Sequence, residues 1–192
     1  AEEGIMLIEE AFDCWETAKK TYDFAKDYYE YAESSLKFMI KRSVNNPAVI
    51  MWSIGNEING GSASICQQLV DWVKEIDTTR PVTMGDNKTS RTAFMDLLDV
   101  VGLNYASDDE YNTLRTSKPN YKIYGSETAS GLMSRGEYTN NNSTQQYSSF
   151  DNNCVSWGDN HAIALKRHME NDYLAGCFVW TGFDYIGEPT SF

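Results

Sequence analysis

The sequence is poor in the residues that metal and redox sites use. It has 2 histidines, His161 and His168, and 4 cysteines, Cys14, Cys66, Cys154 and Cys177. The cysteines contain no Cys-x-x-Cys pair, and the two histidines share a predicted helix without a third ligand, so a zinc site or redox motif lacks its usual pattern. We therefore expect no metal site and no cofactor. We also expect free, mostly buried thiols rather than two disulfides.

Positive charge and long apolar runs are scarce as well. There are 16 Lys and Arg residues against 28 Asp and Glu, which gives a net charge of −12, and no basic stripe stands out. Such a surface repels a phosphate backbone or an anionic membrane. No apolar run approaches the roughly 18 residues that cross a bilayer, and the opening AEEGIMLIEEAF lacks the pattern of a signal peptide. We expect neither nucleic acid nor membrane as a partner.

The sequence does contain short apolar runs that alternate with segments of helical period. Its 192 residues, 41% of them hydrophobic, suit one globular domain. The predicted strands are residues 4–12, 48–57, 81–87, 99–105, 121–128 and 174–185. The predicted helices are residues 23–47, 63–77, about 90–98 and 158–172, with some helical character in the polar stretch before 121 and a loop at 139–153.

This alternation predicts a parallel sheet with helices on its faces, and continuous apolar runs predict strands covered on both sides. An open doubly wound sheet and a closed (β/α)8 barrel both fit. The segment GNEINGGS (55–62) lacks the G-x-G-x-x-G spacing of a dinucleotide site. Polar residues instead follow several strands, which is typical of barrel enzymes. The barrel is favoured, and six predicted strands instead of eight indicate a partial one.

Two carboxylates stand at the ends of apolar strands. Glu57 follows the run AVIMWSIGN, and Glu127 ends YKIYGSE 70 residues later. At typical barrel spacing the two acids would face each other across one mouth, which is the arrangement used for glycoside hydrolysis. The alternative is that each is an ordinary strand-end acid in a salt bridge. Gly55, just before Asn56 and Glu57, is expected to leave room for a ligand near the backbone.

Four segments together resemble the retaining β-glycosidases of glycoside hydrolase family 2. They are LIEEAFDCW, NNPAVIMWSIGNEI, YGSETAS and FVWTGFDYIGEP. The matches are in the family's order and cover nearly the whole chain. The resemblance implies that residues 1–192 are the C-terminal three-quarters of a (β/α)8 TIM-barrel catalytic domain, with strands three to eight. It also implies upstream domains of a parent enzyme as partners, and a homo-oligomer is possible.

The resemblance further implies a role for individual residues. Glu57 would be the general acid/base and Glu127 the nucleophile. Asn56 would hold the sugar 2-hydroxyl, Tyr105 would hydrogen-bond the nucleophile, and Trp180 would line the sugar subsite. Three further acids could bind sugar hydroxyls or be structural: Asp13, Asp86 and Asp184.

The implied activity is cleavage of terminal β-galactosides, because YGSETAS and GFDYIGEP look most like the β-galactosidase branch. β-Glucuronidase and β-mannosidase activities of the same family stay open. A non-catalytic carbohydrate-binding barrel or an inactive fragment is the alternative from another class.

Overall fold

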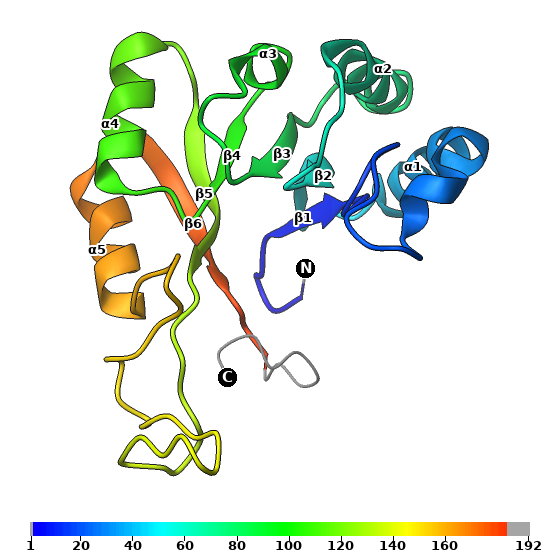
Figure 1. Ribbon diagram of the computed structural model, residues 1–192. Helices are drawn as coiled ribbons and strands as arrows, with labels where there is room; N and C mark the ends of the chain where they lie inside the picture. Colours follow the sequence, from blue (N-terminus) through cyan, green and yellow to red (C-terminus); the bar gives the residue numbers. More distant parts are fainter. Residues whose placement is uncertain (1, 184–192) are drawn as a thin grey trace. The chain divides into compact units, whose positions relative to one another are not determined.

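Figure 1 shows the computed structural model of the chain, in which residues 2–183 are described. The chain divides into two compact units, Ala1–Gly102 and Leu103–Phe192. Each unit consists of parallel strands with helices between them. Within the described residues, no helix combines the length and the apolar character that a membrane crossing requires.

The first unit contains three parallel strands in chain order. They are β1 (Leu7–Glu10), β2 (Val49–Asn56) and β3 (Val82–Asp86), with β1 paired to β2 and β2 to β3. Its helices are the 3-10 helix η1 (Phe24–Asp27), α1 (Tyr28–Ser43), α2 (Ala63–Lys74) and α3 (Thr92–Met95). Helix α2 begins where the Ser62 hydroxyl accepts a hydrogen bond from the Ile65 N–H at 3.2 Å, which satisfies a backbone donor of the first turn.

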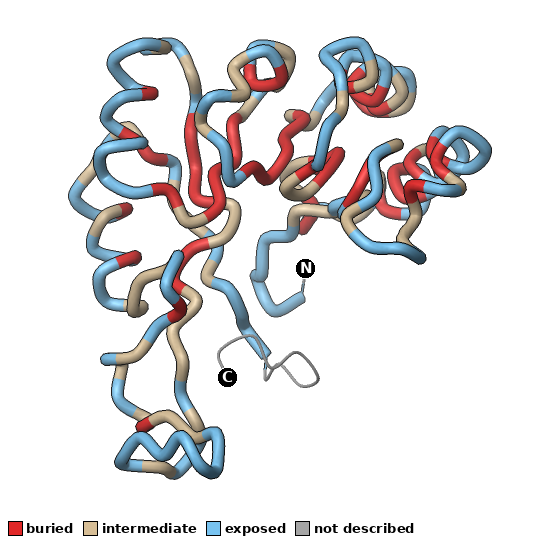
Figure 2. Tube along the Cα trace, viewed as in Figure 1, coloured by how far each residue is buried: buried red, intermediate tan, exposed pale blue. Residues whose placement is uncertain are grey.

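The core of this unit lies between its strands and the two long helices. Figure 2 shows the buried residues of this unit concentrated in β2 and β3 and along one side of α1 and of α2. The completely buried side chains include Trp15, Leu36, Ile40, Trp52, Ile54 and Leu69. Burial of this apolar surface is the main stabilising contribution to the unit.

A buried ion pair in the loop before β3 is hydrogen-bonded to the N-terminal half of β2. The carboxylate of Asp77, 4% exposed, accepts hydrogen bonds from Trp52 Nε1 at 2.9 Å and from Arg80 Nη1 at 2.7 Å. Burial alone would raise the pKa of Asp77, but hydrogen bonds from Thr79, Arg80 and Trp52 outweigh it and lower the pKa. Arg80 also donates to the Val49 carbonyl at 2.7 Å, so one side chain holds both segments.

The second unit is built around two long parallel strands. β5 (Ile123–Ala129) pairs with β6 (Leu174–Trp180), and β4 (Val101–Asn104) runs across the border of the two units. Its helices are α4 (Asp108–Ser117) and α5 (His161–Glu170). Beneath β5, His168 Nδ1 lies 2.9 Å from the Ala164 carbonyl and its Nε2 lies 3.3 Å from the Tyr111 hydroxyl. Burial lowers the pKa of His168, which favours the neutral ring.

The structure corrects two expectations. β3 and β4 are buried throughout, but β1 and β6 are partly exposed, because among residues 2–183 each pairs with a single neighbouring strand. All four cysteines are free, as expected. The thiols are not mostly buried, however: Cys14 and Cys66 are buried, Cys154 is exposed and Cys177 is partly exposed.

Candidate active site

The predicted acid Glu57 directly follows β2. Its backbone has a φ of 45°, in the left-handed region that residues other than glycine rarely adopt. The Glu57 N–H donates to the Gly85 carbonyl of β3 at 2.8 Å, so the neighbouring strand holds this conformation. Glu57 is half-buried. Backbone strain of this kind often accompanies functional positions.

Gly55 has a different role from the one expected. A Cβ at this position would lie 2.8 Å from Ile58 Cδ1 and 2.9 Å from Trp15 Nε1. The Trp15 indole donates to the Ile54 carbonyl at 2.8 Å and therefore sits against the strand. The space beside Gly55 is filled by the protein's own core, and no ligand is needed to explain the glycine.

Asn56 is bound by two residues of the loop that follows β1. Its amide nitrogen donates to Asp13 Oδ1 at 3.1 Å. Lys19 Nζ donates to the same Asp13 oxygen at 2.8 Å and to the Asn56 carbonyl at 2.9 Å. Asp13 therefore contacts a predicted site residue, which its sequence position alone could not indicate.

Asp86, at the end of β3, is 1% exposed and has structural partners. Its Oδ1 accepts a hydrogen bond from the Lys88 N–H at 3.1 Å, and its Oδ2 lies 3.5 Å from Arg91 Nη1. Burial raises the pKa of Asp86, and the negative charge of Glu57 adds to this, while Arg91 and Lys88 lower it. Of the two readings of Asp86, this geometry favours the structural one.

In the second unit, the structure brings Tyr105 and Glu127 together. The Tyr105 hydroxyl donates to Glu127 Oε2 at 2.9 Å, and the Tyr105 N–H donates to the Glu127 carbonyl at 2.8 Å. One residue earlier on each strand, Ser126 Oγ donates to Asn104 Oδ1 at 2.6 Å. The predicted nucleophile is therefore held through both its backbone and its carboxylate.

Trp180 is the last residue of β6 and is 37% exposed. In the strand pairing it lies opposite Ala129, two residues after Glu127, and its carbonyl accepts a hydrogen bond from the Ser130 N–H at 3.3 Å. Asp184 lies outside the described residues. Asn56 and Glu57 belong to the first unit, and Tyr105, Glu127 and Trp180 to the second. Their convergence on one sugar stays a prediction.

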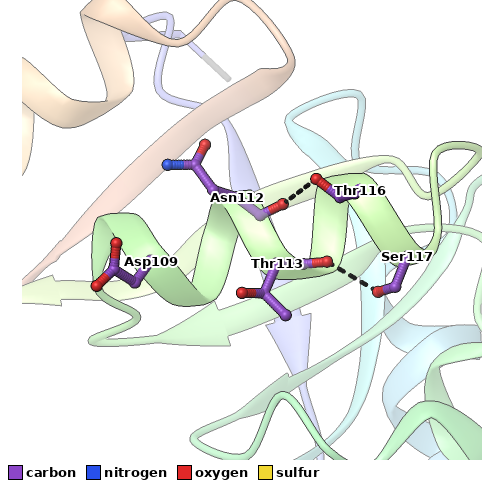
Figure 3. Close-up of a pocket in the computed structure, with 5 residues that line it drawn as sticks. All are labelled: Asp109, Asn112, Thr113, Thr116 and Ser117. Atoms are coloured by element: carbon purple, nitrogen blue, oxygen red, sulfur yellow. Dashed lines mark hydrogen bonds between the residues drawn. The ribbon is translucent and has the colours of Figure 1, made fainter.

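The hollow shown in Figure 3 lies on the exposed side of α4. Its volume is about 630 Å³, and it is lined by Asp109, Asn112, Thr113, Thr116 and Ser117. The Thr116 and Ser117 hydroxyls each donate to a carbonyl one turn earlier in the same helix, at 2.8 Å. Because the Thr116 and Ser117 hydroxyls are satisfied by their own helix, they do not indicate a ligand-binding site. Within residues 2–183 no three His, Cys, Asp or Glu side chains are grouped to hold a metal ion.

Parallel strands in chain order, with polar residues at their C-terminal ends, are typical of the class of (β/α)8-barrel enzymes. Residues 2–186 match the family model described as the TIM barrel domain of glycosyl hydrolases family 2. The chain therefore belongs to glycoside hydrolase family 2. Its fold is the α/β TIM barrel of that family, of which the chain contributes a part.

Individual relatives agree with this assignment. The chain is 33% identical, over 98% of its length, to the beta-galactosidase BoGH2A of Bacteroides ovatus, and spans 28% of that protein. It is 24% identical, over 96% of its length, to a putative beta-glucuronidase of Formosa agariphila, and spans 20% of it. A crystal structure of a beta-glycosidase from Bacteroides vulgatus superposes with a TM-score of 0.85 at 26% identity, over 96% of this chain and 28% of the other. The chain spans less than a third of each relative.

Proposed function

We propose that this chain carries the catalytic groups of a retaining glycoside hydrolase that cleaves terminal β-galactosides. The observation that carries the proposal is the 2.9 Å hydrogen bond from the Tyr105 hydroxyl to Glu127. A donor at this distance stabilises an ionised carboxylate, which is the form a nucleophile needs. The similarity to a β-galactosidase supports galactosides as the substrate.

The reaction would proceed by two displacements. Glu127 attacks the anomeric carbon and forms a covalent glycosyl ester, while Glu57 gives its proton to the departing glycosidic oxygen. Glu57 then takes a proton from water, and the water oxygen attacks the same carbon, expels Glu127 and releases the sugar with retained configuration. This chemistry requires the two carboxyl groups to lie about 5–5.5 Å apart in the active protein.

The remaining predicted site residues would bind the sugar. The Asn56 amide would meet the 2-hydroxyl, where a hydrogen bond can strengthen as charge develops at the neighbouring anomeric carbon. The partly exposed Trp180 indole would pack against an apolar face of the sugar ring. Neither role needs a cofactor.

The assignment of Glu57 is tested by Glu57→Gln, which keeps the side-chain shape but removes the transferable proton. We expect kcat/KM for an alkyl or poor aryl leaving group to fall by roughly 10²–10⁴-fold, the usual contribution of general acid catalysis. A dinitrophenyl galactoside, whose leaving group needs no proton, should lose far less in the first step. Equal losses for both leaving groups would rule out Glu57 as the acid.

The assignment of Glu127 is tested with a 2-deoxy-2-fluoro-β-galactoside carrying a good leaving group. The fluorine slows both steps, but the second more, so the covalent intermediate accumulates. Peptide mass spectrometry should then find the label on Glu127. A label on another carboxylate would refute the assignment.

A second candidate, β-glucuronidase activity, is favoured by the similarity to the Formosa agariphila protein. Aryl β-galactoside, β-glucuronide and β-mannoside compared at one concentration distinguish the three activities. A preference for the glucuronide would mean that glucuronides, and not galactosides, are the substrate. Sugar binding without turnover or labelling would instead indicate a carbohydrate-binding module.

A further inference from the structure

The loop between β1 and η1 places a small polar cluster against Asn56. Asp13 Oδ1 accepts a hydrogen bond from the Asn56 side-chain amide at 3.1 Å and a second from Lys19 Nζ at 2.8 Å. Lys19 Nζ also donates to the Asn56 backbone carbonyl at 2.9 Å. Both the side chain and the main chain of Asn56 are therefore held from outside its own strand, one residue before Glu57.

The Asp13 carboxylate decides which way the Asn56 amide faces. An ionised carboxylate can only accept hydrogen bonds, whereas an amide has a donating nitrogen at one end and an accepting oxygen at the other. A half-turn of the amide would bring Asn56 Oδ1 against Asp13 Oδ1, two acceptors that repel each other. Asp13 therefore selects one of the two amide orientations, and with it the end that the amide presents to a ligand.

Lys19 is itself fixed by the start of the first helix. Asp23 Oδ2 accepts hydrogen bonds from the backbone N–H of Lys19 at 2.6 Å and of Lys20 at 2.9 Å. Asp23 Oδ1 accepts from the Ala25 N–H at 3.1 Å and so caps η1. The Lys19 side chain is 19% exposed, although lysine is normally among the most exposed residues. A covered lysine on an anchored loop loses little further freedom when it binds Asp13 and Asn56.

We propose that Asp13 and Lys19 are positioning residues that orient the Asn56 amide toward the 2-hydroxyl of the glycoside. The inference rests on the proposed function for the identity of the ligand. The orientation of Asn56 by Asp13 and Lys19 does not depend on it. The pair acts through Asn56 and has no contact of its own with the reacting atoms.

The test compares two substrates that differ only at the 2-position. Lys19→Met and Asp13→Asn are assayed with an aryl β-galactoside and with its 2-deoxy analogue. We expect kcat/KM for the galactoside to fall about three- to tenfold, because the Asp13 side chain is 69% exposed and water weakens its hydrogen bonds, and to change less than twofold for the 2-deoxy analogue. Lys20→Met removes the same charge from the next residue and should leave both values unchanged. Lys19→Arg should recover most of the loss, because it restores a donor.

The result that overturns the proposal is an equal loss on both substrates, which would mean general damage to the site. No loss on either substrate would also overturn it. Unfolding midpoints of all variants within 2 °C of the unchanged protein would exclude poor folding as the cause.

A second measurement is independent of turnover. The side-chain amide protons of Asn56 are followed by ¹H–¹⁵N NMR in the unchanged protein and in the variants. A hydrogen bond to a carboxylate moves an amide proton downfield, so Asp13→Asn should return the signal upfield and Lys20→Met should not. If the unchanged protein hydrolyses neither glycoside, the proposed function fails. The amide signal by itself then tests whether Asp13 orients Asn56. An unchanged signal in Asp13→Asn would refute that positioning role.

Discussion

The hydrogen bond between Tyr105 and Glu127 can be removed by a single-atom change. Tyr105→Phe deletes the hydroxyl that lies 2.9 Å from Glu127 Oε2 and keeps the ring. The backbone bond from the Tyr105 N–H to the Glu127 carbonyl at 2.8 Å remains, so the two strand ends stay joined. The change therefore affects the carboxylate of the proposed nucleophile and little else.

The magnitude follows from the chemistry of the bond. A hydrogen bond to a charged group contributes about 1.5–3 kcal/mol. Only the part of this contribution that is made in the transition state affects the rate. At about 1.4 kcal/mol per factor of ten, the full contribution therefore sets an upper limit of roughly 10- to 150-fold on the fall in the rate of nucleophilic attack. Tyr105 and Glu127 are both half-buried, so water can partly replace the hydroxyl. We therefore expect a value in the lower part of that range, about 10- to 30-fold.

The rate of labelling by the fluoro-galactoside measures this step, because it ends when the covalent bond has formed. The matched control is Tyr111→Phe, which removes the hydroxyl 3.3 Å from His168 Nε2 in the same unit. It should lower the free energy of unfolding and leave the labelling rate unchanged. A loss of less than threefold in Tyr105→Phe, or an equal loss in both variants, would refute the role of Tyr105.

The other predictions concern stability. Asp77→Asn leaves the Arg80 guanidinium without its buried carboxylate partner, 2.7 Å away, and should cost about 3–5 kcal/mol in urea unfolding; a cost below 1 kcal/mol would contradict this. Because burial lowers the pKa of His168, the unfolded chain takes up the proton first as the pH falls. The stability from the neutral ring is thus present above the unfolded pKa of about 6.5 and lost below it, and the unfolding free energy lost in His168→Gln should shrink between pH 8 and pH 5. At the left-handed position of Glu57, Glu57→Gly should be more stable than Glu57→Ala by about 1 kcal/mol, the reverse of the usual order, and equal midpoints in urea would contradict the strained backbone.

Most of the strands could be predicted from the sequence, because apolar runs bounded by polar residues leave few alternatives. The predictions 48–57 and 81–87 became β2 (Val49–Asn56) and β3 (Val82–Asp86). The prediction 4–12 was too long, since Ile5 and Met6 are more than 60% exposed and only Leu7–Glu10 pair with β2. An apolar run predicts a strand only as far as a neighbouring strand exists to pair with it.

Helix α4 carried a signal that periodicity did not reveal. Asp108–Ser117 is largely polar and buries only Tyr111 and Leu114. Its start, however, is marked in the sequence by Ser107 and Glu110, which form a capping box with each side chain bonded to the other's backbone. Local hydrogen bonding, more than an apolar face, identifies this helix.

The sequence allowed residues to be proposed for the site, but it did not reveal the contacts that support them. Asn56 and Glu57 could be proposed because they stand at the end of an apolar strand. The Asp13 and Lys19 contacts with Asn56 join residues 43 and 37 positions apart. Nothing in a loop lysine distinguishes a positioning residue from an ordinary surface charge, since only the fold brings it to β2. Asp86 shows the converse, that a strand-end position does not by itself identify a site residue. It ends β3 as Glu57 follows β2, but its carboxylate is buried.

The strand ends share one backbone feature that links the fold to the proposed chemistry. Phe12, Glu57, Tyr105 and Ala129 stand at or just after the ends of β1, β2, β4 and β5, and all have φ between 45° and 71°. Each such conformation costs roughly 1–2 kcal/mol in a residue with a side chain. Backbone hydrogen bonds to an adjacent strand or strand end hold them, as when the Glu57 N–H binds Gly85 and the Tyr105 N–H binds Glu127. Glycine would adopt these conformations at lower cost, so a carboxylate and a phenol at two of these positions agree with the roles proposed for Glu57 and Tyr105.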